Sequence, residues 1–142
     1  MGRTINFSGK LKLICFLLII LGISHGFSAP VFWDGGGGDS LWNNPLNWND
    51  DNIPGLDDDV TIDLNVKVIL AGLDGVAKTV VIGIDDTLKI RPLNNLTIDD
   101  DITINGQLHL EGTATLNVGR HWLRTGTFLA ETSTVIFDGG QN

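Results

Sequence analysis

Aspartates occur in short runs along this chain, and closely spaced carboxylates can supply the oxygen ligands that calcium prefers. One run, at residues 57–59, directly follows a tryptophan-rich segment. Calcium binds about six to eight oxygens, so an aspartate-rich loop on a rigid scaffold is a candidate site, although no run has the spaced D-x-D-x-D-G pattern. Asp57, Asp58 and Asp59 are therefore the candidate calcium ligands. The alternative is that these runs are solvated turns that keep an acidic protein soluble.

Three of the four tryptophans, Trp33, Trp42 and Trp48, fall within residues 31–54, a segment otherwise rich in glycine, aspartate, asparagine and proline. Exposed indole rings could stack on sugar faces, which makes these three the candidate residues of a carbohydrate-binding surface. The second interpretation is burial, because the surrounding glycines and asparagines favour tight turns and large aromatic side chains are mostly buried. We favour an irregular cap in which the indoles cover the open end of the structure that follows.

Enzymatic chemistry has no recognisable motif in this sequence. Glycoside hydrolysis needs two carboxyl groups at a defined separation, and the only glutamates, Glu111 and Glu131, lie in ordinary turn contexts. His109 and His121 have no cysteine or glutamate at the spacing of zinc ligands, and the glycine run at residues 35–38 lacks the Lys-Ser/Thr of a phosphate loop. We therefore expect no enzyme activity and no cofactor apart from the candidate calcium ion.

The N-terminus has the organisation of a secretory signal peptide. Basic residues between Arg3 and Lys12 precede an apolar run at residues 13–23, and small residues follow it. The apolar run is shorter than the roughly 20 residues that span a bilayer. We predict a signal peptide at residues 1–26 and a secreted or cell-surface, extracellular protein without a membrane span after cleavage. A retained N-terminal anchor is the alternative.

Charge and cysteine content exclude further classes. The formal net charge is −8, and loss of three basic residues with the signal peptide leaves six basic and seventeen acidic residues, a net charge of −11. This charge opposes binding to nucleic acid or to anionic lipid. Cys15, the only cysteine, lies in the apolar run, so the mature chain has no disulfide framework, thiol nucleophile or cysteine zinc site.

Apolar and polar residues alternate from residue 60 onward, which is the period of half-buried strands, and no window has helical spacing over three turns. Residues 71–78 (AGLDGVAK) are predicted to form a loop in this all-β body. The predicted strand segments are 60–70, 80–90, 96–110, 116–129 and 135–137.

Short strand triplets recur along this body at spacings of 20, 16, 20 and 19 residues. Irregular repeats of this length indicate a β-solenoid, in which strands of successive coils stack ~4.8 Å apart. The alternative is an antiparallel β-sandwich with hairpins at residues 85–86 and 105–106, since Asn-Gly is a strong hairpin signal. The repeat length favours the solenoid. The triplets are VTI (60–62), VVI (80–82), LTI (96–98), LNV (116–118) and VIF (135–137).

The segment WDGGGGDSLWNNPLNWNDDNIPGLDDDVTI (33–62) resembles the N-terminal module of large secreted bacterial surface proteins, which share a W-D-G-G-G-G cap followed by N-W, V/I-P and D-D-V-x-I elements. Residues 48–90 are also similar to G8-type extracellular domains. The segment HWLRTGTFLAETSTVIFDGGQ (121–141) resembles the G-T-F…S-T-V-x-F-x-G repeat of the same surface proteins. The resemblance implies a right-handed parallel β-helix, secreted or at the cell surface, and supplies no catalytic residues.

These observations predict three parts: the signal peptide at residues 1–26, a Trp/Gly/Asp-rich cap at 27–58, and solenoid coils at 59–142 that are incomplete at the C-terminus. The preferred function is a non-catalytic structural or adhesive segment, the N-terminal part of a longer repeat protein. One alternative is a carbohydrate-binding module for an extracellular polysaccharide or cell-surface ligand. Another is a polysaccharide-degrading β-helix enzyme truncated before its active site. An open last coil also predicts self-association.

Overall fold

Alternating burial of side chains shapes the strands of this protein. The computed structural model describes residues 29–139. In β5 (Thr79–Ile82), for example, Val80 and Ile82 are fully buried while Thr79 and Val81 remain partly exposed. The same pattern recurs in the neighbouring strands, so every coil sends a row of aliphatic side chains into one continuous core.

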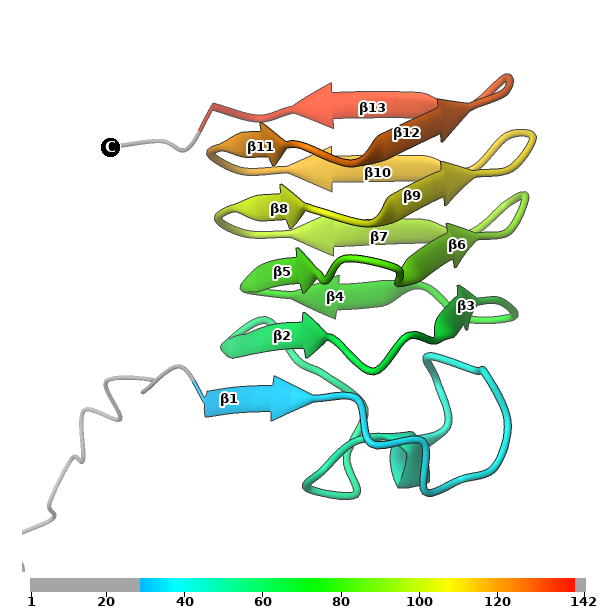
Figure 1. Ribbon diagram of the computed structural model, residues 1–142. Coiled ribbons are helices and arrows are strands. Elements are labelled where there is room, and N and C mark those ends of the chain that lie inside the picture. Colours follow the sequence, from blue (N-terminus) through cyan, green and yellow to red (C-terminus); the bar gives the residue numbers. More distant parts are fainter. Residues whose placement is uncertain (1–28, 140–142) are drawn as a thin grey trace, which may run out of the picture.

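Thirteen strands and one short 3₁₀ helix, η1 (Pro45–Asn47), make up the regular structure of residues 29–139. The strands fall into three parallel sheets, with the orders β1-β2-β5-β8-β11, β3-β6-β9-β12 and β4-β7-β10-β13 (Figure 1). The remaining strands are β1 (Ala29–Phe32), β2 (Asp58–Ile62), β3 (Lys67–Leu70), β4 (Gly75–Ala77), β6 (Thr87–Ile90), β7 (Asn95–Ile98), β8 (Ile102–Ile104), β9 (Gln107–Leu110), β10 (Thr115–Val118), β11 (Trp122–Arg124), β12 (Thr127–Ala130) and β13 (Thr134–Phe137).

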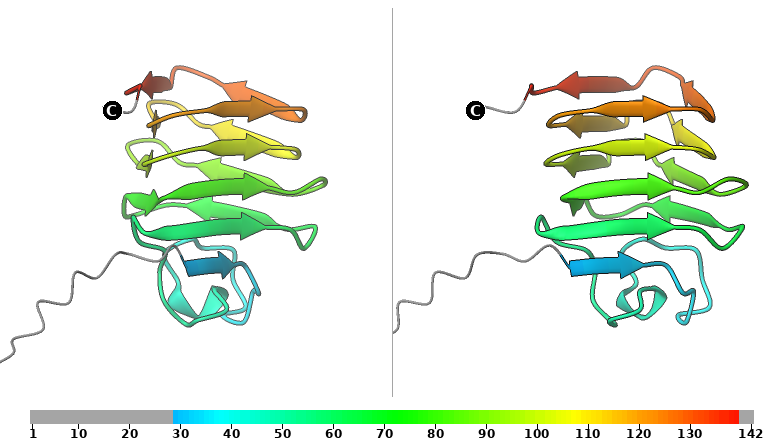
Figure 2. Two further views of the ribbon diagram at one scale, coloured as in Figure 1. Left: turned by 90° about the vertical axis from the view of Figure 1, so that its left-hand side faces the viewer. Right: turned by 60° about the vertical axis from the view of Figure 1, so that its left-hand side comes forward.

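The predicted β-solenoid is confirmed. Each turn of the chain adds one strand to each sheet, and about four turns stack on one another (Figure 2). Val60 pairs with Val80, Val80 with Ile102, and Ile102 with Trp122, so the coil length is 20 or 22 residues along this sheet. Like side chains therefore lie above like, which allows the core rows to run without interruption.

The antiparallel sandwich is wrong. All ten pairings between strands are parallel. Residues 85–86 connect β5 to β6, and residues 105–106 connect β8 to β9, which are strands of different sheets. These turns are corners of the solenoid, and the Asn-Gly pair bends the chain to the next sheet rather than back along its own.

A strand lies where the sequence predicts only a loop. Within residues 71–78, β4 pairs in parallel with β7 and begins the third sheet. Its inward positions are Gly75 and Ala77, which gave no hydrophobic signal. The space is already filled, because side-chain carbons of Leu70 and Leu96 would come within 3.1 Å of a Cβ atom placed on Gly75. Small residues are therefore what this strand needs to pack.

Substitution of Ile82 tests the core rows. Ile82→Ala is expected to lower the free energy of unfolding by about 2–5 kcal/mol, because it leaves a cavity in a fully buried row. The matched control is Ile84→Ala, two residues further on, where the side chain is 72% exposed and the expected change is within about 0.5 kcal/mol. Chemical denaturation measures both, and equal changes would contradict this assignment of inside and outside.

Candidate functional site

The three candidate tryptophans form the centre of a cap beneath the first coil. Trp33, Trp42 and Trp48 are 4%, 0% and 0% exposed. Trp48 lies between the other two, with ring centroids at 5.1 and 4.9 Å and edge-to-face geometry, and its Nε1 donates a hydrogen bond of 2.8 Å to the carbonyl oxygen of Trp42. This arrangement is the buried cap that the sequence favoured. The alternative sugar-stacking surface does not fit it, because the rings offer no exposed face.

The cap also supplies the hydrogen bonds that the first coil lacks below it. β1 pairs with β2 in register, and the main chain around Trp42 lies against β3 as a strand would (Figure 1). The Trp42 amide donates to the carbonyl oxygen of Ile69 at 2.9 Å, and the Ile69 amide donates to that of Ser40 at 2.7 Å. Two of the three sheets are thus closed at this end.

A polar network around Asn47 fixes the cap loops. The buried Asn47 amide donates to Asp39 Oδ1 at 2.7 Å and to the Leu41 carbonyl at 3.0 Å, and its Oδ1 accepts from the Gly37 amide at 3.0 Å. The Leu41 amide and the side chains of Asn47 and Asn44 all donate to Asp39, which lowers the pKa of this carboxyl below its usual value. One asparagine therefore joins three stretches of irregular chain.

The candidate calcium ligands do not converge. Asp57 is exposed, Asp58 Oδ2 accepts the Gly55 amide at 2.7 Å, and Asp59 Oδ1 accepts the Thr79 hydroxyl at 2.8 Å. Within residues 29–139, no group of three or more His, Cys, Asp or Glu side chains is placed to hold a metal ion. The run instead provides turn and inter-coil hydrogen bonds at the start of β2.

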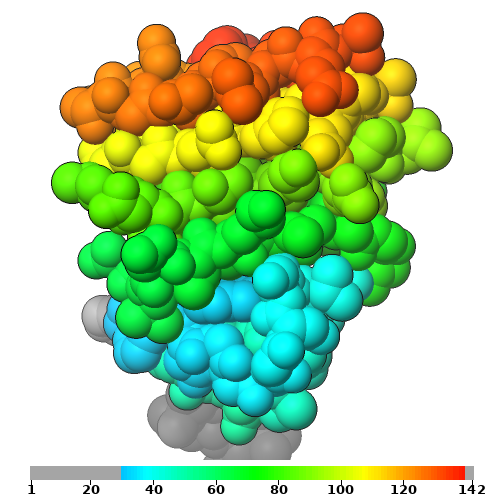
Figure 3. Space-filling model, turned by 45° about the vertical axis from the view of Figure 1, so that its right-hand side comes forward, coloured from blue at the N-terminus to red at the C-terminus, as the bar shows by residue number. Residues whose placement is uncertain are grey.

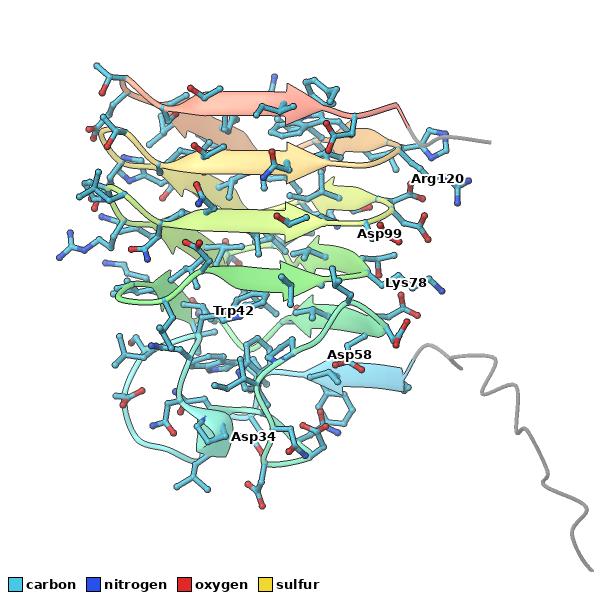
Figure 4. The ribbon with its side chains drawn as sticks, turned by 180° about the vertical axis from the view of Figure 1, so that it is seen from behind. Asp34, Trp42, Asp58, Lys78, Asp99 and Arg120 are labelled. Atoms are coloured by element: carbon cyan, nitrogen blue, oxygen red, sulfur yellow. The ribbon has the colours of Figure 1, made fainter. Side chains whose placement is uncertain are left out.

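Charges of alternating sign stack along one corner of the solenoid. Lys78 donates its amide to the Asp58 carbonyl at 2.9 Å, Asp100 to that of Lys78 and Arg120 to that of Asp100, both at 2.8 Å. Figure 4 shows Asp58, Lys78 and Arg120 one above another on this edge. The Arg120 guanidinium also lies 3.4 Å from Asp100 Oδ1. Such exposed pairs contribute little stability, but like charges stacked directly would be unfavourable, so the column supports the register.

A second set of charges links the coils on the β3-β6-β9-β12 sheet. Lys89 Nζ and the Arg91 guanidinium lie 2.7 and 2.8 Å from the two oxygens of Glu111. The hydrogen bonds from Arg91 and Lys89 lower the pKa of Glu111 to about 2, against the opposing effect of burial. One coil further, His109 Nε2 lies 3.2 Å from Glu131 Oε1. The Gly112 amide and then His109 lower the pKa of the Glu131 carboxyl. Both glutamates that the sequence offered for catalysis thus hold adjacent coils together.

The remaining histidine forms a similar contact. His121 Nδ1 lies 2.8 Å from Asp101 Oδ1, and the His121 amide donates to the same oxygen at 3.1 Å. Burial raises the pKa of Asp101, but these hydrogen bonds and the neighbouring positive charges outweigh it and leave the pKa below its usual value. The absence of catalysis stays a prediction, and no catalytic role is assigned to His109 or His121.

The other end of the solenoid is open. Trp122, Phe128 and Val135 occupy the inward rows of the last coil but are only partly buried, and Phe137 is 59% exposed. Trp122 meets Phe128 and Phe137 edge-to-face, with ring centroids 5.0 and 5.9 Å apart. In Figure 3 this coil forms the top surface of the described residues. The outer edges of β11, β12 and β13 have no partner strand within residues 29–139.

One charged residue stands in an inward row of this open coil. Arg124 pairs with Ile104, which pairs with Ile82, and Ile82 with Ile62, so Arg124 continues a buried isoleucine row. It is exposed there, and its guanidinium donates to the Gly126 carbonyl at 3.0 Å. The open end therefore combines an aromatic cluster with one positive charge, and it is the candidate functional surface of this chain.

A family model described as a domain of unknown function, DUF8693, matches residues 32–134, from the end of β1 to the start of β13. The chain belongs to the DUF8693 family. Cap and coils are thus parts of one family domain. The sequence matches no curated protein and no solved structure. The likeness of the DUF8693 chain to bacterial surface proteins and G8-type domains stays a prediction.

Membrane and export predictions concern mainly residues outside the structure. The predicted signal peptide lies outside residues 29–139. Within that range, the DUF8693 domain forms no helix with the length and apolar character needed to cross a bilayer. Secretion and cell-surface location stay predictions.

Two residues of the DUF8693 domain were missed by reasoning from the sequence. Asn47 is one of several asparagines in the cap segment, and nothing in its local sequence distinguishes it from Asn43 or Asn44. Arg124 did have a signal, because it follows Ile104 by one coil length and replaces an aliphatic residue in the row. Finding it required the correct register, which the triplet spacings alone did not give.

Replacement of Asn47 tests the cap network. Asn47→Ala is expected to lower the free energy of unfolding by about 2–4 kcal/mol, because three hydrogen bonds are lost and buried polar groups lose their partners. Asn52→Ala serves as the control, since the exposed Asn52 side chain bonds only to Asp50 nearby. Denaturation followed by tryptophan fluorescence measures both. Similar values for the two variants would contradict the central role of Asn47.

Acid titration tests the Glu111 contacts. Because the folded-state pKa of Glu111 is about 2 and its ordinary value is 4.5, its stabilising effect is complete above pH 4.5 and is lost as the pH falls towards 2. Over this window the thermal midpoint of the wild type should fall more steeply than that of Glu111→Gln. Circular dichroism melts measure the midpoints, and parallel curves would show that Glu111 contributes no pH dependence.

Proposed function

We propose that this chain is an exported, non-catalytic structural or adhesive segment of a β-solenoid. In this proposal the cap closes one end, and the β11–β13 coil receives a further strand layer of the same polypeptide. The segment would begin a longer repeat protein that is secreted or held at the cell surface.

The difference between the two ends carries this proposal. At the cap, the indoles are buried and two sheets find main-chain partners. At the β11–β13 coil, the inward rows hold partly exposed aromatic side chains and the strand edges are unpaired within the described residues. A β-solenoid needs both ends covered to avoid edge-to-edge association, and another coil would bury the aromatic cluster and satisfy the edges together.

Arg124 sets a chemical requirement for the added layer. A strand stacked on β11 would remove water from the guanidinium, and an unpaired buried charge is strongly unfavourable. The layer must therefore place a carboxylate near Arg124 or leave the long side chain a path to the surface. We expect an aspartate or glutamate in the next coil at this position.

Other features support an extracellular structural role. The predicted mature chain has a net charge of −11 and no cysteine, so it relies on stacked hydrogen bonds and core rows for stability. Glu111, Glu131, His109 and His121 all bridge successive coils, which is a structural use of residues that catalysis would otherwise need. A polysaccharide or cell-surface ligand would have to bind the outer faces rather than the buried indoles.

The intact mass of the native product tests the proposal. Mass spectrometry of the protein from its source is expected to show a chain longer than 142 residues in which β-coils follow residue 139. A native mass that corresponds to the 142-residue chain without its signal peptide, in a monomeric protein, would overturn the extension.

Hydrogen exchange tests the open end on the 142-residue chain. Amides of β11–β13 are expected to exchange about tenfold or more faster than those of β5–β10, because no layer protects their outer edges. The internal control is the cap, where β1 and the Trp42 amide should exchange slowly despite lying at the other end. Equal protection at β11–β13 would mean that this end is already covered in solution.

Self-association is the competing result, and a pair of variants identifies it. If the open coil pairs with a second copy, light scattering will show a dimer that Phe137→Asp abolishes. Phe32→Asp is the matched control, because Phe32 is 50% exposed on the cap strand β1. A dimer lost only in Phe137→Asp would replace extension by end-to-end assembly.

A further inference from the structure

Asp86 is a buried carboxylate with one oxygen that lacks a partner. It lies in the corner between β5 and β6 and is 1% exposed. Its Oδ1 accepts hydrogen bonds from the amides of Val66 at 2.7 Å and Leu64 at 3.2 Å, both in the coil below. Its Oδ2 is buried and has no hydrogen-bond partner. A buried acceptor without a donor costs free energy, more so when it is charged.

A second carboxylate faces the same spot. A Cβ atom placed on Gly83 would lie 2.5 Å from Asp63 Oδ1 and 2.8 Å from Asp86 Oδ2. The two oxygens therefore lie on either side of the bare Cα atom of Gly83, and any side chain there would fill the space between them. Asp63 follows β2 in the first coil, whereas Asp86 belongs to the second coil. Two carboxylates of adjacent coils thus converge on a place kept free by glycine.

Two negative charges at this separation need compensation. The nearest charge columns of the solenoid place a cation against each carboxylate, as Lys89 and Arg91 do for Glu111. No Lys, Arg or His forms an ion pair with Asp63 or Asp86 within residues 29–139. Calcium is bound by carboxylate oxygens at about 2.3–2.6 Å and completes its shell with main-chain carbonyls and water, so two carboxylates can anchor it.

We propose that Asp63 and Asp86 bind one calcium ion that ties the first coil to the second. The site lies at a different corner from residues 57–59, and it uses a pair of carboxylates rather than the group of three that is absent from the described residues. Asp86 would then serve both coils, with Oδ1 on the main chain of the β2–β3 corner and Oδ2 on the ion.

Thermal unfolding of the full chain in calcium and in chelator tests this site. The midpoint is expected to rise by about 5 °C at a calcium concentration tenfold above the Kd, which we expect to lie near 10⁻⁴–10⁻³ M, the range of extracellular modules. Isothermal titration calorimetry should give one ion per chain, and magnesium at the same concentration should have a smaller effect, because it gives up its bound water less readily.

Three isosteric variants locate the effect. Asp86→Asn keeps an oxygen for the Leu64 and Val66 amides and turns its amide nitrogen towards Asp63, so the fold should persist while the calcium response is lost. Asp63→Asn should lose the response as well. Asp85→Asn is the matched control: Asp85 is exposed, and its φ of 68° is one that asparagine adopts readily. Its calcium response should equal that of the wild type.

Two results would overturn the proposal. One is a wild-type midpoint that is the same in calcium and in chelator; a gain in stability of Asp86→Asn in that case would show that the pair shares a proton instead. The other is a calcium response that persists in both Asp63→Asn and Asp86→Asn, which would place the ion elsewhere.

Discussion

A stack of parallel strands satisfies its main-chain hydrogen bonds between coils, so each end of the stack leaves a row of unpaired amides and carbonyls. This constraint governs the whole protein. At the N-terminal end, β1 and the chain around Trp42 act as an incomplete coil that pairs with β2 and β3. The edge-to-face indoles fill the space beneath the first core rows. The cap can be irregular because its job is to supply hydrogen bonds and apolar volume, which do not require regular strands.

Between the ends, register decides what each side chain does. A slip by one residue would move every core side chain to the outer face and every charged one into the core. The charge columns act in the same direction, because they place opposite charges on successive coils: Lys89 and Arg91 face Glu111, and His109 faces Glu131. Polar side chains outside and aliphatic rows inside therefore specify one stacking. Residues that could have served catalysis are used to hold coils in place.

The C-terminal coil lacks this closure within the described residues. Its aromatic side chains are too exposed for a finished core, and Arg124 interrupts the isoleucine row that would continue into the next layer. Membership of the DUF8693 family covers the cap and the coils together, so this asymmetry belongs to a recurring domain. A domain with one closed and one open end is suited to begin an assembly of strands, which is why we place its function in structure rather than in chemistry.

The sequence by itself determined the all-β class, the solenoid and the burial of the cap tryptophans, because alternation, repeat length and the cost of exposing indoles are local properties. Only the tertiary structure decided the register. The 16-residue step from VVI to LTI crosses from one sheet to another, whereas the coil itself is about 20 residues long. β4 was invisible because Leu70 and Leu96 fill the volume that its small residues leave. The contacts of Asn47, Arg124 and the Asp63–Asp86 pair join residues one coil or more apart, or across an irregular loop, and no local pattern encodes which of them meet.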